Sequence, residues 1–256
     1  MTAPGPAPIP GPIPAPTWVL LHYFGGSARS WDPLIPALAG RCVAPDLRGF
    51  GDAAPGGAMR VADYADDIAG LLPEKCVLVG HSMGGKVATA LAARRPPGLR
   101  GLVLVAPSPP GPEPMADEAR AKLRAAWGNP AAAWDVARSI SHHQDGPAFD
   151  RIVADHLRAS RDAWAAWLDR GSREDLRPLA RQVQVPVLVV VGADDAALGP
   201  GAQARETLPM LPGAELRTVA DSRHLVPLDQ PDALAAVMRG WAAARCGVQP
   251  DGTQIR

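Results

Sequence analysis

The sequence predicts an α/β protein whose β-sheet is mostly parallel and is covered by helices on both faces. Short apolar runs alternate along the chain with stretches whose apolar residues recur at helical spacing, the order expected of strand–helix–strand units. The runs at 76–80 ("CVLVG") and 186–192 ("PVLVVVG") are continuously apolar, as strands buried on both faces must be. The 256 residues are enough for one domain with a sizeable core.

The expected elements begin and end at recognisable signals. Pro45 breaks the strand at 42–44 and Pro107 stops the one at 101–106, because proline cannot donate a hydrogen bond to a sheet. Pro231 marks the start of the last helix. About six strands are expected, near 18–21, 42–44, 76–80, 101–106, 187–192 and 214–219, with helices near 62–72, 83–95 and 231–245.

The domain organisation follows from a change of pattern after the fourth strand. Residues 107–183 have helical spacing and no convincing strand. We interpret this stretch as a helical cap, inserted into a core formed by residues 17–106 and 184–248. A proline-rich leader at 1–16 precedes the core.

Four of the seven tryptophans lie in the predicted cap. One interpretation is that they form the interior of the cap, and the alternative is that one or two line an apolar substrate pocket. The residues that we expect to line such a pocket are Tyr23, His81, Trp127, Trp134 and Trp164.

The leader has proline at every second position from Pro4 to Pro16, which favours an extended polyproline II conformation and excludes a helix. It is interpreted as a stiff, exposed segment, with a ligand for a proline-binding domain as the alternative. It has neither the basic nor the apolar region of a secretory signal. No stretch of the chain approaches the ~18 apolar residues that span a bilayer.

Charge and cysteine content limit the classes of partner. The chain has 26 basic and 26 acidic residues, which gives no electrostatic support for binding nucleic acid or an anionic membrane. Cys42, Cys76 and Cys246 are scattered without metal-ligand spacing, as in a reduced cytosolic protein. We therefore expect a cytoplasmic protein with no metal, no nucleic acid and no membrane partner. The sequence does not predict the oligomeric state.

The stretch "GHSMG" at 80–84 has the G-x-S-x-G pattern, with a predicted strand before it and a helix after it. In this context Ser82 sits on a strained, very tight turn that exposes its hydroxyl as a nucleophile. Bulky residues at positions 80 and 84 would clash with the turn. The helix that starts at Met83 directs its N-terminal amides and its positive dipole end toward the serine oxygen.

A serine needs a base to take its proton, and a carboxylate to orient that base. His224 is the candidate base, because it lies in a loop between a predicted strand and the final helix, where sheets of this type present ligands. Asp195 is the candidate acid, with Asp194 as the reserve, because both end the strongest strand. Asp221 is interpreted as a turn residue. The order serine, acid, histidine is the one that this architecture requires.

The remaining histidines have simpler interpretations. His22 and His81 flank glycine-containing loops and are expected to pack and form hydrogen bonds. His142 and His143 are adjacent on a predicted helix, so they face different sides and make a poor metal pair; we interpret them as solvated polar residues.

Five motifs together resemble the α/β-hydrolase family. They are "LHYFGGSARSW" at 21–31, "DLRGFG" at 46–51, "GHSMGG" at 80–85, "VGADD" at 191–195 and "SRHLVPLDQP" at 222–231. The resemblance runs from about residue 17 to 245. It implies that Ser82 is the nucleophile, Asp195 the acid and His224 the base. The backbone N–H groups of Phe24 and Met83 would then stabilise the oxyanion.

The sequence also departs from the family pattern. Tyr23 and Arg223 stand where the family usually has glycine, and no counterpart of the family's first two strands precedes the one at 18–21. Cys42 and Cys76 would lie on strands that this strand separates, which argues against a disulfide.

The resemblance implies a serine hydrolase that cleaves a carboxylic ester, lactone or thioester through an acyl-enzyme, without a cofactor. The stretch "GHSMGGK" and the short leader resemble small bacterial esterases and thioesterases of this family. The layout also resembles enol-lactone hydrolases, C–C bond hydrolases, cofactor-free haloperoxidases and the menaquinone-pathway synthase. The expected substrate is a small molecule with an apolar acyl or aryl group. One alternative is a C–C bond hydrolase or lyase with the same triad, and another is a non-catalytic ligand-binding protein of this fold.

Overall fold

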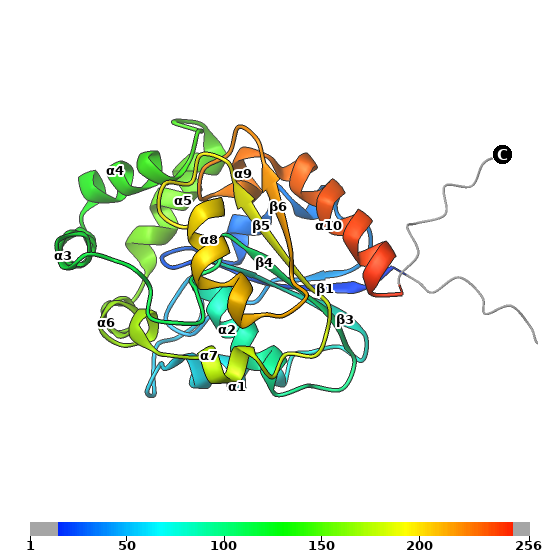
Figure 1. Cartoon of the computed structure of the whole chain (residues 1–256). Helices are drawn as coiled ribbons and strands as arrows, with labels where there is room; N and C mark the ends of the chain where they lie inside the picture. Colours follow the sequence, from blue (N-terminus) through cyan, green and yellow to red (C-terminus); the bar gives the residue numbers. More distant parts are fainter. Residues whose placement is uncertain (1–14, 248–256) are drawn as a thin grey trace, which may run out of the picture.

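The computed structural model describes residues 15–247, so nearly all of the proline-rich leader lies outside the described residues. Six strands form a parallel sheet in the order β2-β1-β3-β4-β5-β6 (Figure 1). They are β1 (Thr17–Leu21), β2 (Cys42–Val43), β3 (Cys76–His81), β4 (Leu99–Val105), β5 (Val187–Gly192) and β6 (Glu215–Val219). The prediction of a mostly parallel sheet of about six strands is confirmed.

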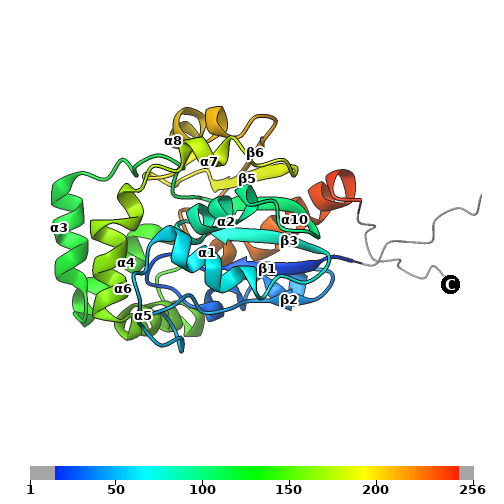
Figure 2. The same cartoon turned by 90° about the horizontal axis from the view of Figure 1, so that it is seen from below.

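Helices connect the strands, and four of them form a separate group. The helices beside the sheet are α1 (Val61–Ala69), α2 (Met83–Ala93), α7 (Arg177–Ala180), α8 (Pro200–Glu206), α9 (Val226–Asp229) and α10 (Pro231–Arg245). Between β4 and β5 lie α3 (Asp117–Ala126), α4 (Pro130–Ile140), α5 (Pro147–Arg158) and α6 (Arg161–Asp169). We call residues 107–183 the helical insertion; α7, at its end, lies beside the sheet rather than in this group. Both views show α3–α6 gathered at one end of the sheet (Figures 1 and 2).

Alternate residues of the strands are buried on opposite faces of the sheet. In β1, Val19 and Leu21 pack in the cluster that includes α1 and α2, whereas Trp18 and Leu20 pack on the face that α10 covers. All four side chains are at most 1% exposed, and burial of apolar surface contributes roughly 25 cal/mol per Å². Burial on both faces is why the inner strands β3 and β5 are apolar runs in sequence, whereas the edge strand β6 contains Glu215, Arg217 and Thr218.

Local sequence signals start two helices of the insertion. The Asn129 side chain accepts a hydrogen bond from the Ala132 N–H at 3.2 Å, and Pro130 occupies the first turn of α4. The Ser160 hydroxyl accepts one from the Ala163 N–H at 3.2 Å and starts α6. Side chains of this kind satisfy amides that lack a partner within the helix.

The cysteines have the arrangement expected from the sequence. Strand β1 separates β2 from β3, so Cys42 and Cys76 are not on neighbouring strands. Both are free, as is Cys246. The expectation that the strand at 18–21 separates the strands of Cys42 and Cys76 is confirmed.

Candidate active site

Ser82 occupies the sharp turn between β3, which ends at His81, and α2, which begins at Met83. Its backbone angles are φ 51° and ψ −114°, in a region that non-glycine residues rarely adopt. Its backbone N–H donates to the Val105 carbonyl at 3.0 Å, and its own carbonyl accepts from the Ser108 N–H at 3.0 Å. Hydrogen bonds to β4 and to the segment after it therefore hold the strained residue in place.

Three glycines around this turn leave room for close backbone contacts. A Cβ atom on Gly80 would lie 2.3 Å from the Gly84 carbonyl oxygen, and one on Gly84 would lie 2.5 Å from the Leu21 carbonyl oxygen. A Cβ atom on Gly85 would lie 2.7 Å from the Cβ of Pro107. The glycine pattern thus reflects the packing of the turn against the ends of β1 and β4.

His224 and Asp195 come from two different loops and meet beside Ser82. Nδ1 of His224 lies 2.8 Å from Oδ2 of Asp195. The N–H groups of Ala197 and Leu198 donate to Oδ1 of Asp195, each at 3.0 Å. Because the carboxylate can only accept, Nδ1 of His224 carries the proton, and the lone pair of Nε2 remains available to accept a proton.

The two groups shift each other's pKa in opposite directions. Burial by itself would raise the pKa of Asp195, but the charge and hydrogen bond of His224, with the two loop amides, lower it to about 2. Burial likewise disfavours the charged form of His224. The charge and hydrogen bond of Asp195 outweigh that effect, so the pKa of His224 is raised above 6.5.

The loop that carries His224 is fixed by Asp229 and by the end of β5. The Asp229 carboxylate accepts from the Arg223 N–H at 2.8 Å and from the Ser141 hydroxyl at 2.6 Å. A Cβ atom on Gly192 would lie 2.1 Å from the Arg223 carbonyl oxygen, so the loop lies directly against the last residue of β5. These contacts determine where the imidazole points.

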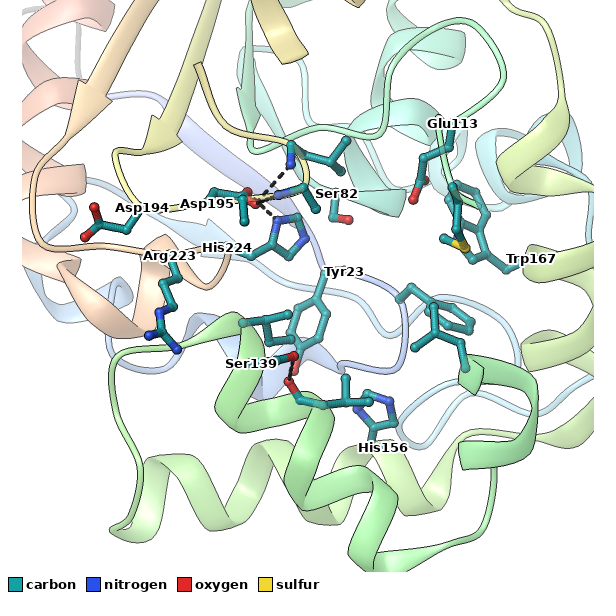
Figure 3. Close-up of a pocket in the computed structure, with 18 residues that line it drawn as sticks. Tyr23, Ser82, Glu113, Ser139, His156, Trp167, Asp194, Asp195, Arg223 and His224 are labelled. Carbon is teal, nitrogen blue, oxygen red and sulfur yellow. Dashed lines mark hydrogen bonds and ion pairs between the residues drawn. The ribbon is translucent and has the colours of Figure 1, made fainter. Parts of the chain in front are cut away.

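A cavity of about 370 Å³ lies between the carboxyl ends of the strands and the helical insertion. Figure 3 shows the Ser82 hydroxyl and the His224 ring on the same side of this cavity, with no hydrogen bond drawn between them. Contacts between a nucleophile and its base often tighten only when substrate binds. The residues that line the cavity are Tyr23, Phe24, Ser82, Glu113, Met115, Leu123, Val136, Ser139, Ile140, His156, Trp167, Asp194, Asp195, Ala196, Ala197, Leu198, Arg223 and His224.

A comparison with known protein families agrees with this arrangement. Residues 18–237 match the sequence profile of the Alpha/beta hydrolase family. The chain belongs to the α/β-hydrolase family.

Individual relatives of this α/β hydrolase share about 30% of its residues. It is 31% identical over 240 residues to the pimeloyl-[acyl-carrier protein] methyl ester esterase of Neisseria meningitidis serogroup B, covering 87% of this chain and 91% of that protein. It is 29% identical over 251 residues to a 2-succinyl-6-hydroxy-2,4-cyclohexadiene-1-carboxylate synthase of Serratia proteamaculans, covering 88% and 92%. The solved structure of a thermophilic esterase from Thermogutta terrifontis superimposes with a TM-score of 0.76 at 29% identity, covering 91% of each chain.

The two expected oxyanion donors lie at the ends of β1 and β3. Met83 is the first residue of α2, whose first amides lack partners within the helix. Phe24 follows the end of β1 by three residues, and its ring lies 4.3 Å from that of Trp164 between centroids. Their roles stay predictions of the family resemblance.

Several residues expected in the pocket lie elsewhere in the structure. Trp127, Trp134, Trp164 and His81 are not among the lining residues of the cavity. Trp127 is 39% exposed and Trp134 packs on Phe149. The direction of each side chain depends on the orientation of its helix about its own axis, relative to the neighbouring helices. This orientation could not be predicted from the sequence.

Other lining residues were missed at the level of sequence. Trp167, not its neighbour Trp164, reaches the cavity wall. His156 is buried and lines the cavity; burial lowers its pKa to about 4. The buried apolar residues Phe149, Ile152 and Val153 of α5 precede His156 at spacings of seven, four and three, so helical periodicity could have placed His156 on the inner face.

Tyr23 lines the cavity, as expected. Its ring would lie 2.6 Å from a Cβ atom on Gly26 and is 5.2 Å from the His81 ring between centroids. Tyr23, which stands where the family usually has glycine, is therefore packed into the loop and is 3% exposed.

The remaining histidines have structural contacts. His22 is buried, with Nε2 accepting from the Leu47 N–H at 2.9 Å and Nδ1 lying 2.8 Å from the Tyr23 carbonyl oxygen. His142 and His143 follow the end of α4 and lie in a loop, so their expected place on a helix is wrong. Nε2 of His142 lies 2.9 Å from Oδ2 of Asp194, and this pair was not foreseen.

Residues 15–247 contain no group of three or more His, Cys, Asp or Glu side chains placed to hold a metal ion. None of the helices there has the length and hydropathy that crossing a bilayer requires.

Proposed function

We propose that this α/β hydrolase cleaves a carboxylic ester, lactone or thioester through an acyl-enzyme formed on Ser82. The observation that carries the proposal is the pair formed by His224 and Asp195 beside Ser82. Asp195 holds the proton on Nδ1 of His224. Nε2 of the same ring therefore has a free lone pair that can take the proton of a nucleophile.

The chemistry would proceed in two stages. The Ser82 oxygen attacks the carbonyl carbon while His224 takes its proton, and the oxyanion is stabilised by the N–H groups of Met83 and Phe24. The intermediate collapses as His224 returns the proton to the leaving alcohol or thiol. Water then attacks the acyl-enzyme with His224 again as base, which releases the acid and restores Ser82.

The cavity supports a small substrate with an apolar acyl or aryl group. Its lining includes the apolar side chains Phe24, Met115, Leu123, Ile140 and Trp167. The helical insertion would act as the cap that excludes water from the reacting bond. The esterase relatives in Neisseria and Thermogutta favour ester cleavage.

The test is hydrolysis of p-nitrophenyl esters of increasing acyl length by wild type, Ser82→Ala and Ser30→Ala. Ser30 is a serine outside the cavity, on the turn after β1. We expect turnover by wild type and Ser30→Ala, with kcat reduced at least about 10³-fold in Ser82→Ala. Turnover that persists in Ser82→Ala would contradict the proposal. Cleavage of a C–C bond in a β-diketone or enolate substrate, without ester hydrolysis, would favour the C–C hydrolase or lyase alternative.

A further inference from the structure

We propose that Glu113 is a specificity-determining residue that favours substrates with a positively charged group over substrates with a carboxylate. The inference rests on the proposed function, because it assigns a substrate preference to the same cavity. Glu113 lies in the proline-rich segment between β4 and α3 and lines the cavity with Ser82 and His224. Figure 3 shows its carboxyl group turned toward the cavity, on the side of Ser82.

The other charged side chains that line this cavity already have partners. Asp195 is paired with His224, and Asp194 with His142. The Arg223 guanidinium donates to the carbonyl oxygens of Arg138 and Ser141, at 2.9 and 3.3 Å, and points away from the cavity centre (Figure 3). Among the described residues that line the cavity, Glu113 is therefore the charged side chain without a partner of this kind in the protein, and its carboxyl is left to interact with a ligand.

The cations nearest to Glu113 are bound to other groups. Nζ of the buried Lys86 donates to the Gly111 carbonyl oxygen at 2.9 Å and to the Ser172 carbonyl oxygen at 3.4 Å. The guanidinium of the buried Arg120 donates to the Ser172 hydroxyl at 2.7 Å and to the Leu168 carbonyl oxygen. Within residues 15–247, no ion pair joins either cation to Glu113.

Glu113 is half-buried. Burial raises the pKa of Glu113, and this effect exceeds the opposing influence of Ser108, Lys86, His224 and Arg120. Ser108 is its neighbouring hydroxyl, but among the described residues that hydroxyl has no partner at hydrogen-bonding distance. A ligand with a positive charge would stabilise the ionised carboxyl of Glu113. A ligand with a carboxylate would be repelled by it.

A binding measurement tests this preference without requiring turnover. Phenyltrimethylammonium and benzoate have the same ring and opposite charges. Their dissociation constants would be measured at pH 8.5 for wild type, Glu113→Gln and Glu118→Gln. Glu118 is an exposed glutamate in the first turn of α3, so its substitution removes one negative charge at a distance from the cavity. Thermal unfolding of each variant would establish that it is folded.

We expect wild type and Glu118→Gln to bind phenyltrimethylammonium at least about tenfold more tightly than benzoate. Glu113→Gln should reduce that ratio about tenfold. An unchanged ratio in Glu113→Gln would overturn the proposal. Wild type that binds benzoate as tightly as phenyltrimethylammonium, or that binds neither, would also overturn it, whatever the variants do.

A second series connects the preference to catalysis. The p-nitrophenyl esters of pentanoate, 4-trimethylammoniobutyrate and glutarate differ chiefly in charge. The ratio of kcat/KM for the cationic ester to that for the anionic ester should fall about tenfold in Glu113→Gln. If wild type does not hydrolyse even the neutral pentanoate ester, the proposed function fails, and the binding ratio still decides the role of Glu113.

Discussion

Nδ1 of His224 lies 2.8 Å from Oδ2 of Asp195, and the other carboxylate oxygen of Asp195 accepts two backbone N–H groups. All three donors point to the side chain of Asp195, which is 2% exposed. The backbone of its own loop thus holds the Asp195 carboxylate in place through one oxygen, and the other oxygen orients the imidazole of His224. This relationship distinguishes Asp195 from Asp194, which lies one residue earlier in the chain.

Asp195→Asn should lower kcat by about 10³–10⁴-fold, because the amide can donate to Nδ1 and would favour the wrong tautomer of His224. Asp194→Asn is the matched control. Asp194 is half exposed and pairs with His142, and exposed pairs contribute only about 0–1 kcal/mol. Steady-state kinetics on one p-nitrophenyl ester would compare the two. A larger loss in Asp194→Asn than in Asp195→Asn would reverse the assignment of the acid.

The activity should fall on the acid side of the pH profile, because protonated His224 has no lone pair with which to act as a base. The pKa of His224 is raised by Asp195 despite burial, so the midpoint of the fall in kcat/KM should lie above 6.5 in the free enzyme. In Asp195→Asn the midpoint should move to lower pH. A profile that stays flat from pH 5 to 8 would argue against His224 as the base.

Gly192→Ala should displace the loop that carries His224, because Gly192 is the last residue of β5 and lies directly against this loop. The new Cβ would lie 2.1 Å from the Arg223 carbonyl oxygen and 2.3 Å from that of Ser222, so the backbone must move. We expect a loss of about 1–3 kcal/mol in the free energy of unfolding, together with reduced kcat. Gly240→Ala in α10 is the control, since no atom lies within 4 Å of its Cβ position, and it should be neutral or slightly stabilising. Urea denaturation and ester kinetics would measure both effects, and equal behaviour of the two variants would contradict this prediction.

Lys86 gives the protein a pH-dependent stability that can be isolated. Burial lowers its pKa from 10.5 to about 8. Between these values the unfolded chain holds a proton that the folded protein has released, so this group makes the free energy of unfolding rise with pH. Urea denaturation at pH 8 and pH 10 should show wild type gaining up to about 2 kcal/mol relative to Lys86→Met. No difference between the two proteins across this range would show that Lys86 is not a buried cation.

The parts of the fold that could be predicted are those in which the pattern of apolar residues in the sequence directly reflects which side chains are buried. The run that becomes β5 is apolar at every position because both faces of the sheet are covered. Ser82 could be chosen as the candidate nucleophile because the glycines on either side of it indicate a tight turn. The structure shows the close backbone contacts that leave no room for a side chain at Gly80 and Gly84. Asp195 and His224 could be chosen because each follows a recognisable strand, and the carboxyl ends of parallel strands meet at one edge.

The cavity wall contributed by the helical insertion could not be predicted in this way. Trp164 and Trp167 lie one helical turn apart on α6, yet only Trp167 lines the cavity, because the rotation of α6 against α3 and the core decides which ring faces inward. Glu113 gave even less signal. It stands in a proline-rich segment without periodicity, and its place beside Ser82 depends on how the chain leaves β4.

The most direct test of the central claim is the site of covalent labelling by a fluorophosphonate, located by mass spectrometry of proteolytic fragments. If Ser82 is the activated nucleophile of this hydrolase, wild type carries one phosphonyl group on Ser82, and Ser82→Ala carries none. Labelling of a different residue, equal labelling of Ser82→Ala, or no labelling of folded wild type would contradict the assignment.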